Sequence, residues 1–343
     1  MASPIRPLVV VTGVGPFSLG ERIVVEILTA RPGTNILGID ITPNPRLARL
    51  HAYHELIIDL NPLHNLEGLR AFAANISIQL ERCLEDLGAS SIEVLIQSAG
   101  TYDSGSFLEC DTRKREQVLG VNLFGHIEVL HAVMGLNSRR GFSNPAHLTY
   151  LDVGSFHGLH ARKDRSLYAV SKAAVIDMCT ALVEGDELLR CFYLAPCPID
   201  THMLHKNHWV QKAGGSLEFF EAVFRESFVT YEGIFRACDQ HQLRRFICNT
   251  GHNQDEVLAA FATYVAERRA AYSGPLGVLS PEACAEVVAT LVFREQPFAS
   301  GVYFVSLAAG GRPSVQYAAF GDLTRRESLT RIGSRVNVIA GEA

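Results

Sequence analysis

Short apolar runs that alternate with longer amphipathic stretches limit the fold of this chain more than any other feature. The apolar run at 8–11 leads into a helical pattern at 21–30, and the alternation continues to residue 194. A strand that is apolar throughout is buried on both faces, and the intervening helices can supply the cover. The pattern therefore predicts an α/β fold in which helices lie on both faces of a doubly wound parallel sheet.

The hydrophobic periodicity also sets the expected bounds of the elements. We expect strands at residues 8–11, 35–39, 56–59, 92–96, 147–153, 190–194 and 301–306. We expect helices at residues 21–30, 66–87, 117–136, 168–184 and from 281 onward, and the looser stretch 205–277 allows helices at 217–238 and 254–272. Because the alternation resumes after residue 280, we expect a single domain over 1–343.

The composition of the 343 residues is that of a globular protein, with 48% hydrophobic and 20% charged residues. The net charge of -5 and the lack of a basic stripe argue against a nucleic-acid partner. The eight cysteines show no Cys-x-x-Cys or zinc spacing, which favours a reducing compartment. We find neither a secretory pattern nor an apolar stretch of membrane-spanning length, so we expect a cytoplasmic protein with no membrane partner.

A glycine-containing loop, Thr12-Gly-Val-Gly-Pro-Phe-Ser-Leu-Gly20, joins the first expected strand to the first expected helix. In such a turn the backbone can approach a pyrophosphate, which then lies at the helix N-terminus. Asp40 ends the second strand, where a carboxylate binds the adenosine ribose hydroxyls and repels a 2'-phosphate. This favours NAD(H), although the nearby Arg46 keeps NADP(H) possible.

Tyr168 and Lys172 lie four residues apart in a run of good helix formers, so their side chains share one helical face. A phenol ordinarily loses its proton near pH 10, and an ammonium group beside it favours the phenolate. Tyr-x-x-x-Lys alone recurs by chance, so the surrounding motifs carry the argument. These are Gln97-Ser-Ala-Gly100, Asn122, Ser155 at thirteen residues before Tyr168, and Ala195-Pro-Cys-Pro-Ile-Asp-Thr201.

Together these motifs resemble the short-chain dehydrogenase/reductase family, in its variety with one Rossmann-type domain. The resemblance covers residues 7–204 and resumes at 280–306. It implies that Tyr168 is the general acid/base and that Lys172 lowers the pKa of Tyr168 and holds the nicotinamide ribose. It also implies that Ser155 binds the reacting oxygen and that Asn122 kinks its helix and fixes a water in a proton relay.

The same resemblance implies a set of cofactor-binding residues along the carboxyl edge of the sheet. The glycine loop would face the pyrophosphate, Asp59 the adenine, and the segment 196–201 the nicotinamide. The set comprises Thr12, Gly13, Gly15, Phe17, Ser18, Leu19, Gly20, Asp40, Asp59, Leu60, Ser98, Ala99, Gly100, Tyr168, Lys172, Pro196, Ile199 and Thr201.

Three departures from the family pattern affect these expectations. The usual Thr-Gly-x-x-x-Gly-x-Gly is not kept, because Phe17 and Leu19 stand at the later glycine positions unless one residue is inserted, which aligns Ser18 and Gly20 with them. Gln97-Ser98 replaces the usual Asn-Asn or Asn-Ala, and Cys197 replaces a glycine. The first departure matters most, since pyrophosphate binding depends on close backbone approach.

The run Val-Thr-Gly-x-Gly-Pro-Phe also resembles the start of pyroglutamyl peptidases, but no Glu, Cys and His pattern follows it.

The chain is also longer than a compact member of the family. A long insertion at the carboxyl edge of an open parallel sheet lies over the ligand crevice, so we expect 205–277 to form an inserted helical lid. Residues 308–343 are expected to form a polar C-terminal extension that packs over the body. His202, His205 and His208 recur every three residues, but no carboxylate or cysteine pattern joins them, so we expect no metal site.

The sequence thus predicts an NAD(P)-dependent oxidoreductase that interconverts a carbonyl and an alcohol by hydride transfer. The lid suggests a bulky small-molecule substrate, such as a specialised metabolite in a biosynthetic reaction. Two alternatives remain open: an NAD-dependent epimerase or dehydratase of the same superfamily, and a non-catalytic dinucleotide-binding scaffold. The family commonly pairs through the helices that here hold Asn122 and Tyr168, which implies a homodimer or homotetramer.

Overall fold

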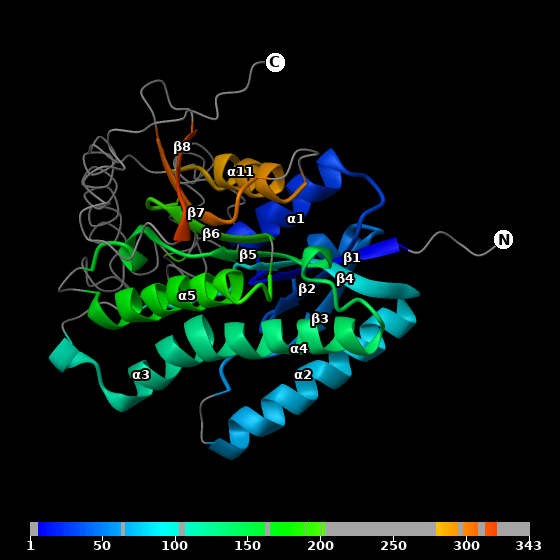
Figure 1. The fold of residues 1–343 in the computed structure, drawn as a ribbon, viewed down its shortest axis with the longest axis horizontal. Helices are drawn as coiled ribbons and strands as arrows, with labels where there is room; N and C mark the ends of the chain where they lie inside the picture. The colour runs from blue at the N-terminus through cyan, green and yellow to red at the C-terminus, as the bar shows by residue number, and fades with distance from the viewer. Residues whose placement is uncertain are drawn as a thin grey trace, which may run out of the picture.

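The structure is a computed structural model, and it describes residues 6–62, 66–102, 107–161, 165–188, 190–199, 201, 203, 279–293, 298–307 and 313–320. These residues contain one eight-stranded sheet in the order β3-β2-β1-β4-β5-β6-β7-β8 (Figure 1). Its strands are β1 (Arg6–Thr12), β2 (Asn35–Asp40), β3 (Tyr53–Ile57), β4 (Ala89–Gln97), β5 (Thr149–Val153), β6 (Arg190–Pro196), β7 (Gly301–Leu307) and β8 (Pro313–Ala318). Neighbouring strands from β3 to β7 are parallel and β8 pairs antiparallel with β7, which confirms the predicted α/β fold.

Helices cover both faces of this sheet. Figure 1 shows α1 and α11 on one face and α2, α4 and α5 on the other. The helices are α1 (Leu19–Ala30), α2 (Leu66–Asp86), α3 (Thr112–Leu119), α4 (His126–Arg139), α5 (Ser166–Glu184) and α11 (Pro281–Phe293). A π-helical segment, Gly120–Gly125, joins α3 to α4.

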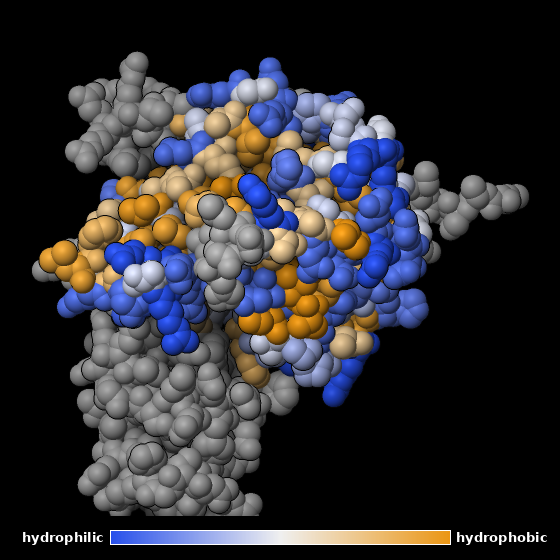
Figure 2. All heavy atoms as spheres, turned by 90° about the horizontal axis from the view of Figure 1, so that it is seen from below, coloured by the Kyte–Doolittle hydropathy of each residue, from blue (hydrophilic) through white to orange (hydrophobic). Residues whose placement is uncertain are grey.

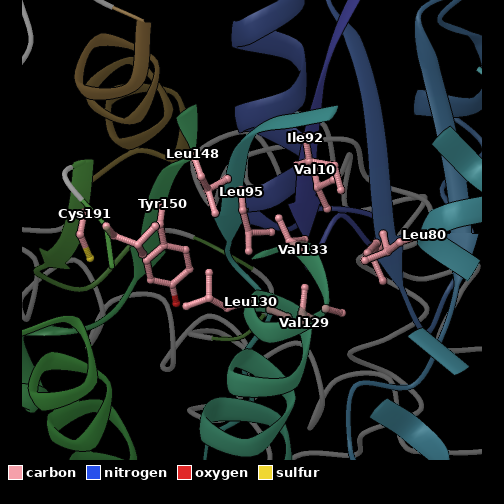
Figure 3. Packing of buried hydrophobic residues seen from close by; sticks show 14 of the residues in the cluster. Val10, Leu80, Ile92, Leu95, Val129, Leu130, Val133, Leu148, Tyr150 and Cys191 are labelled. Carbon is pink, nitrogen blue, oxygen red and sulfur yellow. The ribbon is translucent and has the colours of Figure 1, made fainter. Parts of the chain in front are cut away.

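The strand β1 shows how the sequence produces this layered arrangement. Successive side chains of a strand point to opposite faces. Val9 and Val11 pack in the core beneath α1 and α11, whereas Leu8 and Val10 pack in the core beneath α2 and α4. Figure 3 shows part of the second core, where Val10 lies near Ile92, Leu95 and Val133. Burying both faces explains the unbroken apolar run, since each fully buried Val or Leu contributes about 1.5–3 kcal/mol.

The strand order places a crevice between β1 and β4. From β1 the chain moves outward through β2 and β3, and it then returns to β4 on the other side of β1. The segments that leave the carboxyl ends of β1 and β4 therefore diverge, and ligands of open α/β sheets bind at such a point. Hydrogen bonds hold these segments in place: Gly13 N–H donates to Ile39 O (2.8 Å) and Ser98 N–H to Thr12 O (3.2 Å).

Several predicted bounds need correction. The third strand begins three residues earlier than predicted, at Tyr53, because its half-exposed His54 and Glu55 interrupt the apolar pattern at the sheet edge. The long helix predicted from residue 117 begins at Thr112, where the Asp111 carboxylate accepts the Lys114 N–H. The extension predicted at 308–343 contributes an edge strand, β8, rather than only a polar tail.

Other predictions fall on parts of the chain that the structure does not describe. They are the lid at 205–277, its helices at 217–238 and 254–272, most of the extension, and the histidine series at 202, 205 and 208.

Two helical stretches, 112–139 and 166–184, are long and apolar enough by length and composition to span a membrane, so the expectation that none would be is wrong. Both stretches pack against the sheet and supply core residues such as Val129, Val133 and Val175. Core helices pass the same test of length and composition. Figure 2, which views the molecule from below Figure 1, shows apolar patches broken up by hydrophilic side chains on this face.

Candidate active site

A cleft of about 1200 Å³ lies at the carboxyl ends of β1, β4, β5 and β6. Its wall brings together most of the residues predicted for the site. The predicted residues on the wall are Gly13, Gly15, Phe17, Ser18, Leu19, Asp40, Asp59, Leu60, Ser98, Ala99, Gly100, Ser155, Tyr168, Lys172, Pro196, Ile199 and Thr201. Thr12, Gly20 and Asn122 are buried behind the wall instead.

The glycine loop adopts a compact turn despite its altered spacing. Gly13 has a left-handed φ of 73°, and a Cβ there would overlap the backbone of Ala99. A Cβ at Gly20 would overlap the carbonyl oxygen of Gly13, so α1 begins in close contact with the end of β1. Ser18 caps α1 by accepting the Glu21 N–H (3.0 Å). Gly20 therefore provides the close approach between helix and turn, which supports the one-residue insertion.

Phe17 shows the cost of that insertion. Its φ of 63° lies in the left-handed region, which favours glycine and is uncommon for an aromatic residue. The Phe17 N–H donates to Glu21 Oε2 at 2.6 Å, and this bond helps to hold the turn. The backbone thus keeps a turn suited to glycine at a position where the sequence has none.

Asp40 lies on the cleft wall next to the glycine loop. Its carboxylate accepts the N–H groups of Gly15 (2.8 Å) and Thr42 (2.9 Å). Burial raises the pKa of Asp40 above its ordinary value, although these hydrogen bonds act in the opposite direction. The carboxylate therefore links the glycine loop to the loop after β2 while it remains on the cleft wall.

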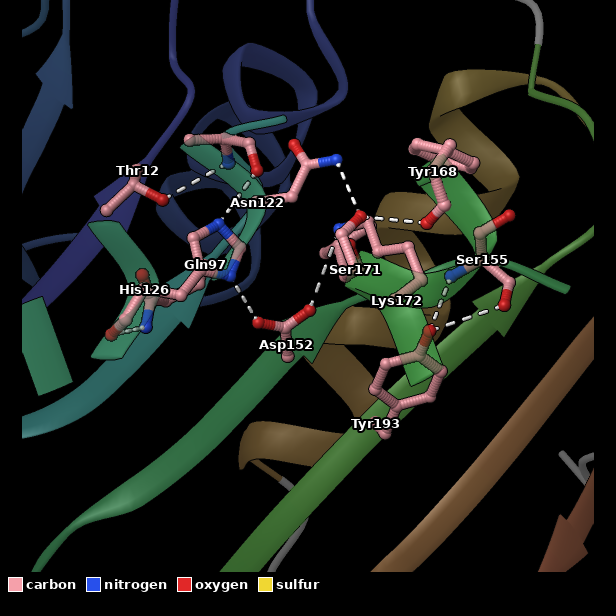
Figure 4. Close-up of polar contacts among 12 residues, drawn as sticks. Thr12, Gln97, Asn122, His126, Asp152, Ser155, Tyr168, Ser171, Lys172 and Tyr193 are labelled. Carbon is pink, nitrogen blue, oxygen red and sulfur yellow. Dashed lines mark hydrogen bonds and ion pairs between the residues drawn. The ribbon is translucent and has the colours of Figure 1, made fainter. Parts of the chain in front are cut away.

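Asn122 connects the end of β4 to α5. It lies fully buried in the π-helical segment, where the helix is locally widened. Its side chain accepts the Thr101 N–H (2.7 Å) and donates to Thr101 O (2.8 Å). It also donates to Ser171 Oγ (3.1 Å), next to Lys172 (Figure 4).

Ser155 is held by a tyrosine from the neighbouring strand. Tyr193 of β6 accepts the Ser155 N–H (3.0 Å) and donates to Ser155 O (3.3 Å), as Figure 4 shows. Burial raises the pKa of Tyr193 well above its ordinary value, so the phenol keeps the proton that it donates. A Cβ at Gly154 or Gly158 would collide with the Tyr193 ring or hydroxyl, so both glycines make room for this contact.

Tyr168 and Lys172 lie on one face of α5, as their spacing predicts. The Lys172 side chain is almost fully buried, and its Nζ donates to Val153 O (3.1 Å). The half-buried Tyr168 ring has Tyr102 at 5.6 Å and His157 at 6.2 Å between ring centroids, both edge-on. Aromatic edges therefore border the ring of Tyr168 while Lys172 anchors the same helix to β5.

A fully buried polar pair, His126 and Asp152, lies behind Lys172. His126 Nε2 faces the carbonyl oxygen of Ala99 (2.9 Å), which can only accept, so this nitrogen carries a hydrogen. The 2.6 Å contact between His126 Nδ1 and Asp152 Oδ2 requires another hydrogen between them. Burial tends to raise the pKa of Asp152, but the charges of His126 and Lys172 outweigh it and lower that pKa. Asp152 is therefore held as a carboxylate between His126 and Lys172, and its Oδ1 lies 3.9 Å from Lys172 Nζ.

Two neutral side chains complete this network. Gln97 Nε2 donates to His126 O (2.8 Å) and to the Tyr150 hydroxyl (3.2 Å), which in turn donates to Asp152 Oδ2 (3.1 Å). Gln97 is the residue that replaces the family's usual asparagine, and its longer amide reaches both partners. The amide nitrogen of Gln97 therefore joins the buried network, whereas Gln97 Oε1 is buried without a hydrogen-bond partner among the described residues.

Sequence reasoning missed several residues on the cleft wall. Tyr102, Phe156, His157 and Arg165 lie at the end that holds Tyr168, and the Arg165 guanidinium carbon lies 4.3 Å from the centroid of the Tyr102 ring. Proximity to the Ser155 and Tyr168 motifs was the only available signal for them. Among the described residues, no three His, Cys, Asp or Glu side chains are grouped so that they could hold a metal ion.

The residues of the cleft fit a dinucleotide. Gly13 and Gly15 leave the backbone bare where the N-terminus of α1 opens onto the wall, and Asp40 lies beside them. Lys172 and Tyr168 lie on the same continuous wall, at the carboxyl end of β5. A glycine loop at a helix N-terminus with a carboxylate beside it suits a ligand with a pyrophosphate and a ribose.

Comparisons with known proteins agree with this geometry. Residues 8–211 match the family model described as short chain dehydrogenase. An uncharacterized oxidoreductase from Staphylococcus saprophyticus is 29% identical over 134 residues, which cover 38% of this chain and 53% of the relative. The chain thus spans about half the length of this curated relative.

Solved structures share the fold at low sequence identity. The ligand-free aldohexose dehydrogenase of Thermoplasma acidophilum is 20% identical, with a TM-score of 0.56 over 87% of this chain and 91% of that one. A short chain dehydrogenase family protein of Francisella tularensis is 15% identical, with a TM-score of 0.53 over 87% and 95% of the two chains. The family model matches more than half of the chain. The chain belongs to the short-chain dehydrogenase family.

Proposed function

We propose that this protein is an oxidoreductase that moves a hydride between a nicotinamide cofactor and a carbonyl/alcohol pair on a small molecule. The observation that carries the proposal is that Ser155, Tyr168 and Lys172 lie on the wall of the same cleft as the glycine loop and Asp40. A cofactor held at the glycine loop would therefore extend toward the three side chains that the family uses for proton transfer.

When bound, the nicotinamide cofactor would supply the hydride that the carbonyl carbon accepts in the direction of reduction. Tyr168 donates a proton to the carbonyl oxygen, and the Ser155 hydroxyl donates a hydrogen bond to the same oxygen as negative charge develops there. Lys172 would place a positive charge near Tyr168 and would hold the nicotinamide ribose. In the direction of oxidation, Tyr168 takes the alcohol proton.

We further propose that NAD(H) is preferred to NADP(H). A carboxylate on the wall at the adenosine end would accept hydrogen bonds from ribose hydroxyls and would repel a 2'-phosphate. Asp40 is such a carboxylate, and hydrogen bonds from Gly15 and Thr42 fix its position. A structure of ElxO with NADP bound also resembles this chain, at 14% identity and a TM-score of 0.56 over 87% of this chain and 96% of that one, so both cofactors need testing.

A homodimer or homotetramer, paired through the helices that hold Asn122 and Tyr168, is a further part of the proposal. What supports it is the family to which the chain belongs, and Val170 on α5, which is 55% exposed in the single chain, would be covered in such a pair. Size-exclusion chromatography with light scattering would test it, and a monomer at micromolar concentration would contradict it.

The experiment that tests the main proposal combines a cofactor titration with a substrate panel. NADH and NADPH binding would be followed by nicotinamide fluorescence, and turnover would be measured on a panel of carbonyls and alcohols. We expect Tyr168→Phe to lower turnover about 10²–10⁴-fold while NADH affinity stays within about threefold. Tyr317→Phe, which changes a tyrosine on the edge strand β8, is the matched control and should retain turnover.

Each contrary result has a distinct meaning. Undiminished turnover in Tyr168→Phe would contradict the role given to Tyr168. Substrate conversion without net change in cofactor redox state would identify an epimerase or dehydratase. Cofactor binding with no turnover on any substrate would favour a scaffold, and no binding of either cofactor would contradict the whole proposal.

A further inference from the structure

A buried carboxylate, Glu21, lies directly behind the glycine loop. Only 1% of the residue is exposed, and both of its oxygens contact neighbouring groups. Glu21 Oε2 accepts the Phe17 N–H (2.6 Å), and Glu21 Oε1 lies 2.9 Å from Arg46 Nη1. The carboxylate lies in the first turn of α1, where the helix dipole favours negative charge.

Arg46 belongs to the loop that follows Asp40, and this loop is fastened to the glycine loop. Asn44, which is fully buried, donates from Nδ2 to Val14 O (2.8 Å). Its Oδ1 accepts the N–H groups of Arg46 (3.1 Å) and Leu47 (3.2 Å). These hydrogen bonds fix the backbone of Arg46, and the ion pair with Glu21 sets the direction in which its side chain extends.

The guanidinium group is consequently held behind the loop rather than on the cleft wall. Its carbon lies 5.6 Å from the centroid of the Phe17 ring. Phe17, Asp40, Ile41 and Thr42 line the cleft, whereas Arg46 does not. A cation that follows the second strand is the usual means of binding a 2'-phosphate, and here that cation is bound to a carboxylate instead.

Moving Arg46 toward the cleft would leave the buried Glu21 carboxylate without its cationic partner, with only the Phe17 N–H and the N-terminus of α1 to stabilise its charge. Such a change is costly, because breaking a buried ion pair leaves a charge that has lost its hydration only partly compensated. A 2'-phosphate at the ribose would therefore meet the Asp40 carboxylate and could not recruit Arg46.

We propose that Glu21 is a specificity-determining residue that keeps Arg46 out of reach of a 2'-phosphate, so that two carboxylates, Asp40 and Glu21, select against NADP(H). This inference rests on the proposed function, because it concerns the cofactor of that reaction. It adds a second residue to the selection, and that residue acts by holding a cation away rather than by meeting the ligand.

The test measures dissociation constants for NADH and NADPH by nicotinamide fluorescence in a short series of variants. Asp40→Ser removes the direct repulsion, and Asp40→Ser with Glu21→Gln also releases Arg46. The Gln side chain can still accept the Phe17 N–H, so the turn is retained. We expect the double variant to bind NADPH about tenfold tighter than Asp40→Ser alone, with NADH changed less than about threefold. Adding Arg46→Ala should abolish the gain.

A matched control separates this effect from a general loss of negative charge. Glu55 is another carboxylate bound to the same loop, where it accepts the Asn44 N–H (2.8 Å) and the Tyr53 hydroxyl (3.1 Å). Glu55→Gln in the Asp40→Ser background should leave the ratio of NADPH to NADH affinity unchanged. A similar gain in this control, or a gain that persists without Arg46, would overturn the inference.

Arg46→Ala in the Asp40→Ser background keeps the inference testable if the Glu21 variant does not fold. Because Arg46 is held by Glu21, this variant should bind NADPH as Asp40→Ser does, and a selective loss of NADPH affinity would overturn the inference. Failure of the proposed function looks different, since the wild-type protein would then bind neither cofactor. If the wild-type protein binds NADH but the Glu21 variant leaves the ratio of NADPH to NADH affinity unchanged, only the role of Glu21 is contradicted.

Discussion

The two ends of the cleft, the adenosine end that we propose at the glycine loop and the catalytic end that we propose at Tyr168, differ in the contacts that lie behind them. At the adenosine end, side chains bind backbone groups: Asp40 accepts the Gly15 N–H, Glu21 the Phe17 N–H, and Asn44 donates to Val14 O. At the catalytic end, side chains such as Lys172 and Tyr193 also bind the backbone, but His126 and Asp152 in addition bind one another in the interior behind Lys172.

The difference shows what each end requires of the sequence. A pyrophosphate is bound mainly by backbone groups, so the spacing of the glycines can change if other side chains restore the turn. A proton-transfer site needs particular side chains in fixed positions, so the Ser, Tyr and Lys residues stay in the expected order. We therefore expect the catalytic end to lose more from removal of one buried partner than the adenosine end loses from a change in its loop.

The largest effect is expected from breaking the buried pair at the catalytic end. His126→Leu would leave the Asp152 carboxylate, which has no exposed surface, without its 2.6 Å partner, and Lys172 Nζ at 3.9 Å would be its remaining cation. Removing one member of a buried ion pair costs about 3–5 kcal/mol. We expect a loss of this size in the free energy of unfolding, measured by urea denaturation at pH 7.

The double variant His126→Leu with Asp152→Leu is the control, because replacing both charges by apolar groups should recover much of the loss. Acid provides an independent check. The pKa of Asp152 is lowered in the folded state, so its charge stabilises the fold above the unfolded value of about 4, and this stabilisation is lost as the pH falls through the folded value. Asp152→Asn should therefore flatten the acid limb of stability, and an unchanged limb would contradict the assignment of charge.

The sequence predicted the local features of the site but not the pairs of side chains that come together from distant parts of the chain. Strand-forming residues and the order of Ser155, Tyr168 and Lys172 are local features, so their placement on one wall followed from a parallel sheet. The buried pair could not be predicted, because His126 and Asp152 lie 26 residues apart and neither carries a motif. Glu21 and Arg46 were missed as a pair because the contact depends on how the loop after β2 folds back.

An intermediate effect is expected at the glycine loop. Gly20→Ala would drive a Cβ into the carbonyl oxygen of Gly13, a backbone atom that can move only with the turn itself. We expect a loss of about 1–3 kcal/mol in the free energy of unfolding and weaker NADH binding.

Gly135→Ala in α4 is the control: its Cβ would meet only the end of the Arg139 side chain, at 3.6 Å. That variant should be neutral or more stable by about 0.4–1 kcal/mol, and equal behaviour of the two would show that the close approach at Gly20 is unimportant.

The smallest effect on stability, about 1–2 kcal/mol, is expected where the two kinds of support meet, at Tyr193. Its hydroxyl is a buried side-chain group that binds the backbone of Ser155, so Tyr193→Phe would leave the Ser155 N–H without this acceptor. Tyr303→Phe removes a comparable hydroxyl, which donates to Ala299 O (2.7 Å) away from Ser155, and should cost a similar amount. Turnover separates the two variants: Tyr193→Phe should lower kcat about tenfold with NADH affinity unchanged, because a displaced Ser155 reaches the substrate oxygen poorly, whereas Tyr303→Phe should keep wild-type kcat. Equal kcat values in the two variants would mean that Tyr193 stabilises the fold without positioning Ser155. Hydrogen bonds from side chains to the backbone would then matter less at the catalytic end than at the adenosine end.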